Sequence, residues 1–178
     1  MKLILALTTV LFFFHALAQP YPQGDIDFSK LKGTWFQIAS IKQDWEQNCT
    51  CTTFNFGTPF HDLLNVTASC KTPEKQLDVK GYLGFLETPL GKLPGQYQFI
   101  FNGKRTIEFY IKVDPDYNFI VLGQPPAYAF TILSRTPQFN EKVYSKLIRM
   151  LQKDFKFDVA KIERTYQQND CQYTLIDV

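Results

Sequence analysis

Histidine is scarce in this chain, with two in 178 residues. His15 lies in an N-terminal apolar run, and His61 lies in a predicted turn. Ser–His–Asp catalysis, Cys–His catalysis and multi-histidine zinc sites all need a histidine placed among other functional groups. The sequence therefore predicts a protein that is not an enzyme and that holds no metal and no cofactor.

The sequence also lacks an excess of charge of one sign, since 19 Lys and Arg stand against 17 Asp and Glu. A surface that binds nucleic acid needs a dense basic patch, and no basic run interleaved with aromatic residues occurs. Beyond the N-terminal run, no stretch approaches the roughly twenty apolar residues of a membrane-spanning helix. We therefore expect neither a nucleic-acid partner nor an integral membrane segment.

The N-terminus has the composition of a secretory signal. Lys2 precedes an apolar run over residues 3–17, and Ala16 and Ala18 have the spacing at which signal peptidases cleave. We interpret residues 1–18 as a signal peptide and residues 19–178 as one domain, which predicts a secreted, extracellular protein.

The four cysteines of the predicted mature chain are an even number, which in a secreted protein indicates two disulfides out of three possible pairings. Two β-rich runs, residues 50–56 and 63–69, predict a hairpin in which Cys49 lies opposite Cys70. Cys51 is then left for Cys171. A metal site is disfavoured, because the Cys-x-Cys pair has no further ligands nearby.

Two Asn-x-Thr triplets, at Asn48 and Asn65, are candidate glycosylation sites in a secreted chain. The hairpin register places Asn65 and Cys70 on opposite faces of their strand. If the cysteines face outward, Asn65 points inward, where it could not easily carry a glycan. A bulge or a place near the rim of the sheet would remove this conflict.

Alternation of apolar and polar residues dominates the chain from Gly33 onward and predicts eight strands. They cover residues 34–41, 51–56, 63–70, 76–86, 96–101, 106–113, 117–122 and 128–134. Short turns between them, Asn102-Gly103 above all, favour an up-and-down antiparallel sheet that closes into a barrel. A sandwich is the alternative that the spacing leaves open.

Helical signals flank these strands. Phe28 and Leu31 fit one helical turn before the first strand, and apolar residues at steps of four predict an amphipathic helix over residues 137–155. We expect this C-terminal helix to pack on the outside of the sheet. A last strand-like segment, residues 161–166, leads to Cys171.

Three motifs in order make the chain similar to the lipocalin family, and in particular to its apolipoprotein D-like branch. Gly33-Thr34-Trp35 resembles the family's Gly-x-Trp signature on the first strand. Residues 114–117, Asp-Pro-Asp-Tyr, resemble its Thr-Asp-Tyr turn, although Val113 stands where the family has Thr and Pro-Asp is inserted before the Tyr. Arg135 resembles the Arg that ends the eighth strand, and Cys51 with Cys171 matches a family bridge.

The resemblance implies an all-β fold, an eight-stranded barrel with one helix outside, which carries a small hydrophobic molecule such as a fatty acid, sterol, retinoid or bilin. It also implies structural roles for Gly33, Trp35 and Arg135, with Trp35 closing one end of the barrel and Arg135 lying against its ring. Trp45 would then lie at the open rim, as a lid, as a peripheral membrane contact or as an incidental exposed residue.

Alternation anchored on Trp35 and Arg135, together with the resemblance, predicts which side chains line the interior and bind the ligand. The sixth strand stays undecided, because the helix also needs an apolar face to pack on. A second function also stays open, in which the loops of the open end bind another protein. The predicted ligand-binding residues are Gln37, Ala39, Phe54, Phe56, Tyr97, Phe99, Phe101, Phe119, Val121, Ala129, Thr131 and Leu133.

Overall fold

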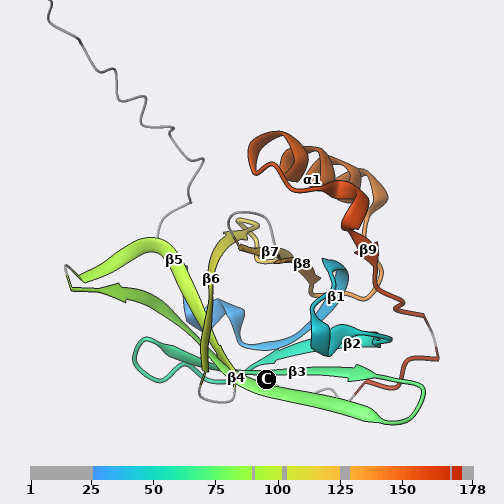
Figure 1. Cartoon of the computed structure of the whole chain (residues 1–178), viewed down its shortest axis with the longest axis horizontal. Coiled ribbons are helices and arrows are strands. Elements are labelled where there is room, and N and C mark those ends of the chain that lie inside the picture. The colour runs from blue at the N-terminus through green and yellow to red at the C-terminus, as the bar shows by residue number, and fades with distance from the viewer. Residues whose placement is uncertain (1–25, 90, 102–103, 125–128, 169, 174–178) are drawn as a thin grey trace, which may run out of the picture.

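The computed structural model of the chain describes residues 26–89, 91–101, 104–124, 129–168 and 170–173. The predicted signal peptide and the Asn102-Gly103 turn lie outside the described residues. Strands dominate the described part, and three short 3₁₀ helices (η) and one α-helix accompany them (Figure 1). The elements are η1 (Phe28–Leu31), β1 (Gly33–Ile41), η2 (Asp44–Glu46), β2 (Thr50–Phe56), β3 (Leu63–Lys71), β4 (Gln76–Thr88), β5 (Gly91–Phe101), β6 (Lys104–Val113), β7 (Phe119–Gln124), β8 (Ala129–Ser134), α1 (Glu141–Asp154), η3 (Val159–Lys161) and β9 (Glu163–Arg164).

The strands form an up-and-down antiparallel barrel. Each strand from β1 to β7 pairs with the next, and β1 also pairs with β8, so the sheet returns to its first strand. The β1–β2 pairing is short and covers residues 33–36 of β1, so these eight strands close the sheet only in part. The prediction of a barrel is confirmed over the sandwich. β9 adds two residues alongside the second half of β1.

The observed strands differ from the sequence prediction by small shifts at their ends, and the starts of β5 and β7 show why. β5 begins at Gly91, inside the predicted turn, and Pro94 falls where the β4–β5 ladder loses register, a place that tolerates proline because no N–H is needed there. β7 begins at Phe119, two residues later than predicted. Tyr117 has a φ of 55° and donates its N–H to the Asp114 carbonyl, so it belongs to the turn.

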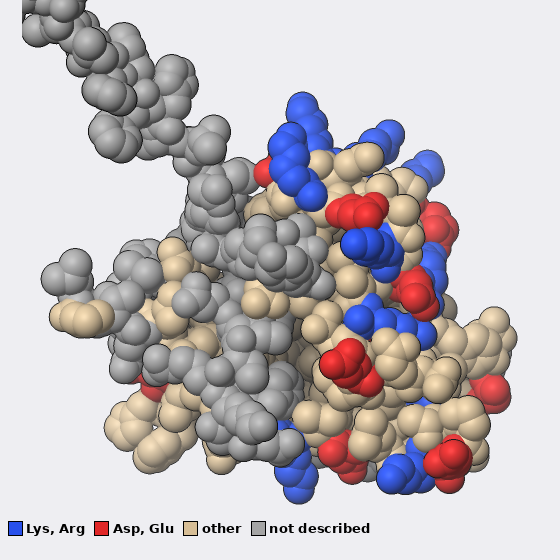
Figure 2. Space-filling model, in the orientation of Figure 1, with Lys and Arg blue, Asp and Glu red and all other residues tan. Residues whose placement is uncertain are grey.

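Helix α1 covers the outside of the barrel, as predicted. It begins at Glu141 because the Asn140 side chain accepts hydrogen bonds from two N–H groups of the first turn. The opposite face carries exposed Lys and Arg, and charges of both signs are interspersed on the described part of the face in Figure 2. We call the apolar residues between helix and sheet the outer cluster: Ile38, Val121, Phe130, Ile132, Leu147, Leu151 and Phe157.

Close packing at Gly123 brings the C-terminal segment onto the sheet. A Cβ atom at this position would lie 3.1 Å from the Phe157 ring, tighter than ordinary van der Waals contact. Phe157 itself is buried, and its ring lies 5.5 Å from the Phe130 ring between centroids, with the two planes tilted by 51°. A glycine in β7 therefore lets the residues after α1 lie directly on the strand.

The C-terminal tail fills a seam between β1 and β2. The β1–β2 ladder covers only residues 33–36 of β1, and the tail takes over beyond it. Thr165 donates its N–H to the Ile38 carbonyl, and the Gln167 side chain donates to the carbonyls of Gln37 and Thr52. The Cys51–Cys171 disulfide fastens this tail, so it completes the wall of the barrel.

The end of the barrel at Trp35, which we call the Trp35 end, is tightly closed. Trp35 has no exposed surface and donates its indole N–H to the Leu31 carbonyl at 2.7 Å. The Arg135 guanidinium lies 3.9 Å from the centroid of the Trp35 ring and donates to the carbonyls of Lys30, Lys32 and Thr34. Gly33, at a φ of 99°, makes the change of direction between η1 and β1. η1 is thus held across the barrel end by one cation.

We expect Arg135→Ala to lower the free energy of unfolding by about 2–4 kcal/mol, because it removes a cation–π contact and several charge-assisted hydrogen bonds. Arg164→Ala is the matched control, since Arg164 also lies 3.9 Å from a ring centroid, that of Tyr144, but at the surface. Arg164→Ala should lower the free energy of unfolding by less than about 1 kcal/mol. Urea denaturation followed by far-ultraviolet circular dichroism measures both, and equal losses would contradict the role given to Arg135.

Candidate ligand-binding interior of the barrel

The interior of the barrel is lined by a second set of buried apolar residues, which we call the inner cluster. Its members come from η1 and from the strands around the barrel, and most have exposed fractions of 0–1%. The inner cluster consists of Ile26, Phe28, Leu31, Trp35, Phe54, Phe56, Leu64, Val66, Ala68, Leu83, Tyr97, Phe99, Val113, Ile120, Leu122 and Leu133.

The lining changes in size along the barrel axis. The register places large residues at the Trp35 end, where Phe28, Phe85 and Tyr97 pack ring against ring at 5.0–5.8 Å. The Tyr97 hydroxyl accepts a hydrogen bond from the Ile26 N–H there. Toward the other end, which we call the η2 end, small residues occur among the inward positions, beside the larger Phe54 and Leu122 and the ring of Trp45. The small residues are Ser40, Ala68, Ala129 and Thr131.

Most of the predicted interior residues lie on the inner face. Phe54, Phe56, Tyr97, Phe99 and Leu133 belong to the inner cluster. Gln37, Ala129 and Thr131 are buried and share the face of Leu133, Gln37 as its ladder partner and the other two by alternation along β8. The side chain of Phe101 lies outside the described residues.

Three predicted interior residues do not line the interior. Phe119 and Val121 pack in the outer region beneath α1, while Ile120 and Leu122 face inward. Alternation could not be carried correctly across the Asp114–Asn118 turn. The prediction for Ala39 is wrong for a different reason, an irregularity within β1 itself.

A bulge in β1 reverses the alternation. The β1–β8 register shifts between Gln37 and Ala39, so Ala39 pairs with Ile132 of the outer cluster and Ser40 pairs with inward-facing Thr131. One extra residue in a strand has this effect because side chains alternate with a period of two. The bulge is not visible in the sequence, since Ile38, Ala39 and Ser40 are all compatible with either face.

The hairpin of β2 and β3 differs from the prediction that Cys49 lies directly opposite Cys70, and from the case in which both face outward. Cys49 and Cys70 are bonded, yet they are not directly opposite, because Cys51 has a φ of 54° and the register shifts between Thr50 and Thr53. Cys70 shares the buried face of Ala68 rather than facing outward. Asn65 is therefore exposed, and the conflict over its glycosylation does not arise.

A polar group of four side chains lies on the inner face toward the η2 end. Gln37 donates through Nε2 to Glu46 Oε1 and to Thr131 Oγ1, the latter at 3.2 Å. Thr131 in turn donates to the Ala39 carbonyl. Ser40 lies at the ladder position beside Thr131. We call Gln37, Ser40, Glu46 and Thr131 the polar group.

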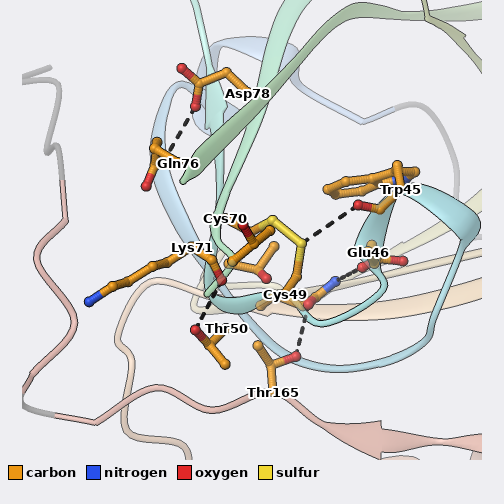
Figure 3. Close-up of a disulfide and its surroundings, with 12 residues drawn as sticks. Trp45, Glu46, Cys49, Thr50, Cys70, Lys71, Gln76, Asp78 and Thr165 are labelled. Carbon is orange, nitrogen blue, oxygen red and sulfur yellow. Dashed lines mark hydrogen bonds between the residues drawn. A yellow bond between two sulfur atoms is a disulfide. The ribbon is translucent and has the colours of Figure 1, made fainter. Parts of the chain in front are cut away.

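Glu46 reaches this position because η2 folds it inward. The Gln43 N–H donates to Glu46 Oε2 at 2.8 Å, and the Cys49 N–H donates to the Glu46 carbonyl. The Cys49–Cys70 disulfide ties the segment to β3, beside Trp45 and Glu46 (Figure 3). Trp45 packs edge-on against Phe54 at 6.2 Å and is half-buried. The loop after β1 is therefore a fixed part of the barrel lining.

Sequence reasoning missed Glu46, because a charged residue in a loop is usually exposed. Burial raises the pKa of the Glu46 carboxyl, and hydrogen bonds from Gln37 and from the Gln43 N–H oppose this effect. One signal was available in the sequence. A glutamine predicted to face an apolar interior, Gln37, requires a hydrogen-bond partner nearby.

The family model for the lipocalin-like domain matches residues 26–167, which covers the barrel, α1 and the start of the tail. The chain belongs to the lipocalin family. This match confirms the family that the motifs at Gly33, Trp35 and Arg135 predicted. It is also consistent with the similarity of the chain to the apolipoprotein D-like branch.

Individual relatives of this lipocalin support the same family. Temperature-induced lipocalin-1 of Arabidopsis thaliana is 28% identical over an alignment of 166 residues, and the match covers 81% of each chain. H1 crustacyanin from the lobster Homarus americanus matches with a TM-score of 0.64 at 17% identity, over 85% of this chain and 91% of that one. Insecticyanin from the tobacco hornworm Manduca sexta matches with a TM-score of 0.63 at 18% identity, over 86% and 88%. At these identities the solved structures show the fold alone.

The described part of the lipocalin offers no competing site of two other kinds. No group of three or more His, Cys, Asp or Glu side chains there is arranged to hold a metal ion. No helix among the described residues is long and apolar enough to span a membrane.

We expect the stability of the ligand-free protein to fall with rising pH because of Glu46. Its raised pKa means that the folded state keeps a proton that the unfolded state releases, so the free energy of unfolding decreases above about pH 4.3. Glu46→Gln cannot ionise, so the variant gains stability relative to wild type as the pH rises above the ordinary pKa of a glutamate, about 4.3. Denaturation at several pH values measures this gain. The exposed Glu141→Gln is the control, and a constant difference between wild type and Glu46→Gln would contradict the prediction.

Proposed function

We propose that this lipocalin is a secreted carrier that binds one small hydrophobic molecule inside the barrel. The observation that supports this most strongly is the continuous apolar lining of the barrel, which includes small residues on β1 and β8 toward the η2 end. The Trp35 end is closed by η1 and Arg135, so a ligand would enter from the η2 end. Fatty acids, sterols, retinoids and bilins are the ligand types that family membership favours.

The energetics of apolar burial support carriage. Removing a few hundred Å² of apolar ligand surface from water is worth roughly 25 cal/mol per Å². After the cost of association, this supports binding at about micromolar affinity or tighter. The barrel is held by the Trp35–Arg135 contact and two disulfides, so little of this energy is spent on ordering the protein.

We assign no catalytic step to the interior. All four cysteines are in disulfides, so thiol-dependent chemistry has no nucleophile. The Glu46 carboxyl is engaged by Gln37 and by the Gln43 N–H. These contacts favour a binding role for the polar group over acid–base catalysis.

Apolar binding can be tested with N-phenyl-1-naphthylamine, a dye that is uncharged at neutral pH and fluoresces in apolar surroundings. We expect saturable one-to-one binding to the mature protein. Thr131→Trp should weaken dye binding about tenfold or more, because a large ring in place of an inward-facing threonine would occupy the interior beside Leu122. Ser69→Trp is the matched control, since Ser69 lies on the outer face of β3, and it should leave the affinity unchanged.

The second candidate function predicts a different result in the same titration. A barrel whose interior is filled would show no saturable dye binding although the protein is folded. Large buried residues on β5 and β7, such as Phe99 and Leu122, fill part of the interior and favour this second function. That outcome would overturn the carrier proposal in favour of loops that bind another protein.

Secretion and glycosylation form a separate prediction. The disulfides suit an oxidising compartment. Asn48 and Asn65 are both exposed, so an oligosaccharide has access to each. Expressed with its own N-terminus in animal cells, the chain should reach the medium beginning at Gln19 and lose mass on treatment with peptide N-glycosidase F. Asn48→Gln and Asn65→Gln assign the sites, and a protein retained in cells with residues 1–18 intact would contradict the proposal.

A further inference from the structure

We propose that the polar group of Gln37, Ser40, Glu46 and Thr131 binds the ammonium head of a cationic amphiphile, whose apolar body lies against the inner cluster. The ligand class is a primary amine attached to a hydrocarbon chain or ring system. This inference rests on the proposed carrier function and adds the chemistry of the head group to it.

The Glu46 carboxyl is buried and forms no ion pair among the described residues, although the more distant charge of Lys42 also acts on it. The residue is 4% exposed. The cation close in sequence, Lys42, instead lies 3.3 Å from the Glu163 carboxylate on the outside of the barrel. A buried carboxylate without a counter-ion is costly, which leaves Glu46 suited to a cation that arrives with a ligand.

The carboxyl also has unused hydrogen-bonding capacity. Glu46 Oε1 accepts from the Gln37 side chain, and Oε2 accepts from the Gln43 N–H. An ionised carboxylate offers about four acceptor positions, so roughly half remain available. An ammonium group has three N–H donors and can use several of them at once.

Ser40 provides an independent observation at the same place. Its side chain is 1% exposed, and its hydroxyl makes no hydrogen bond in good geometry, although it lies close enough to the Glu46 carboxyl to lower the pKa of that group. The bulge in β1 places Ser40 on the inner face beside Thr131. The Ser40 hydroxyl oxygen therefore accepts no hydrogen bond, and a ligand N–H would supply one.

These groups discriminate between head groups. An amine supplies both the missing positive charge and the donors. An alcohol supplies one donor without charge. A carboxylate adds a second negative charge beside Glu46, so a fatty acid should bind least well. The small residues of the η2 end then contact the first carbons of the chain, and the inner cluster contacts the rest.

The test is displacement of bound N-phenyl-1-naphthylamine by n-decylamine, n-decanol and decanoate, which share one chain length. We expect n-decylamine to displace the dye at a concentration about tenfold or more below that of n-decanol, with decanoate weakest. Glu46→Gln should weaken n-decylamine about tenfold and leave n-decanol and the dye within about twofold. Ser40→Ala should weaken the amine by a smaller factor, and Glu141→Gln, outside the barrel, should change nothing.

The outcomes separate this inference from the carrier proposal. Saturable dye binding with the three decyl compounds equally effective on wild-type protein would overturn the inference and leave the carrier intact. The inference would also be wrong if Glu46→Gln weakened all three compounds alike. Absence of dye binding to the folded wild type would overturn the carrier proposal, and the head-group inference with it. The order in which the three decyl compounds displace the dye from wild-type protein needs no variant. The test therefore stays decisive even if Glu46→Gln fails to fold.

Discussion

The bulge in β1 near Ile38 is the constraint on which the rest of the barrel depends. It ends the ladder with β2 after residue 36, and the seam it leaves is closed by the tail through Thr165, Gln167 and the Cys51–Cys171 disulfide. It also turns Ser40 inward beside Thr131. A single extra residue thus decides both how the wall is completed and which polar atoms enter the interior.

The two ends of the barrel use their charged residues in opposite ways. At the Trp35 end, Arg135 is satisfied by three carbonyls and an aromatic ring, so its charge serves only to hold η1 across the barrel. At the η2 end, the Glu46 carboxyl accepts hydrogen bonds from the Gln37 side chain and the Gln43 N–H and forms no ion pair among the described residues. Arg135 therefore needs no further partner, whereas the Glu46 carboxyl can accept further hydrogen bonds from a bound cation.

The sequence was sufficient for what local pattern controls. Alternation and turns predicted the strands, the motifs at Gly33, Trp35 and Arg135 predicted the family, and the hairpin predicted which cysteines are bonded. The sequence prediction failed where a single residue changes which side chains of a strand face inward. The left-handed Tyr117 led to Phe119 and Val121 being placed inside, and the β1 bulge did the same for Ala39. Glu46 was missed because its burial depends on contacts from β1 and η2 together.

Locating a bound ligand tests carriage inside the barrel more directly than any affinity does. Isotope-filtered nuclear Overhauser spectra of ¹³C-labelled protein with bound N-phenyl-1-naphthylamine report protons of the dye close to protein methyl groups. We predict contacts to inner-cluster methyls, such as those of Leu122 and Leu133, and to the Ala129 and Thr131 methyls. Contacts confined to outer-cluster methyls such as Ile132 and Leu147, or to exposed side chains, would contradict a ligand site inside the barrel.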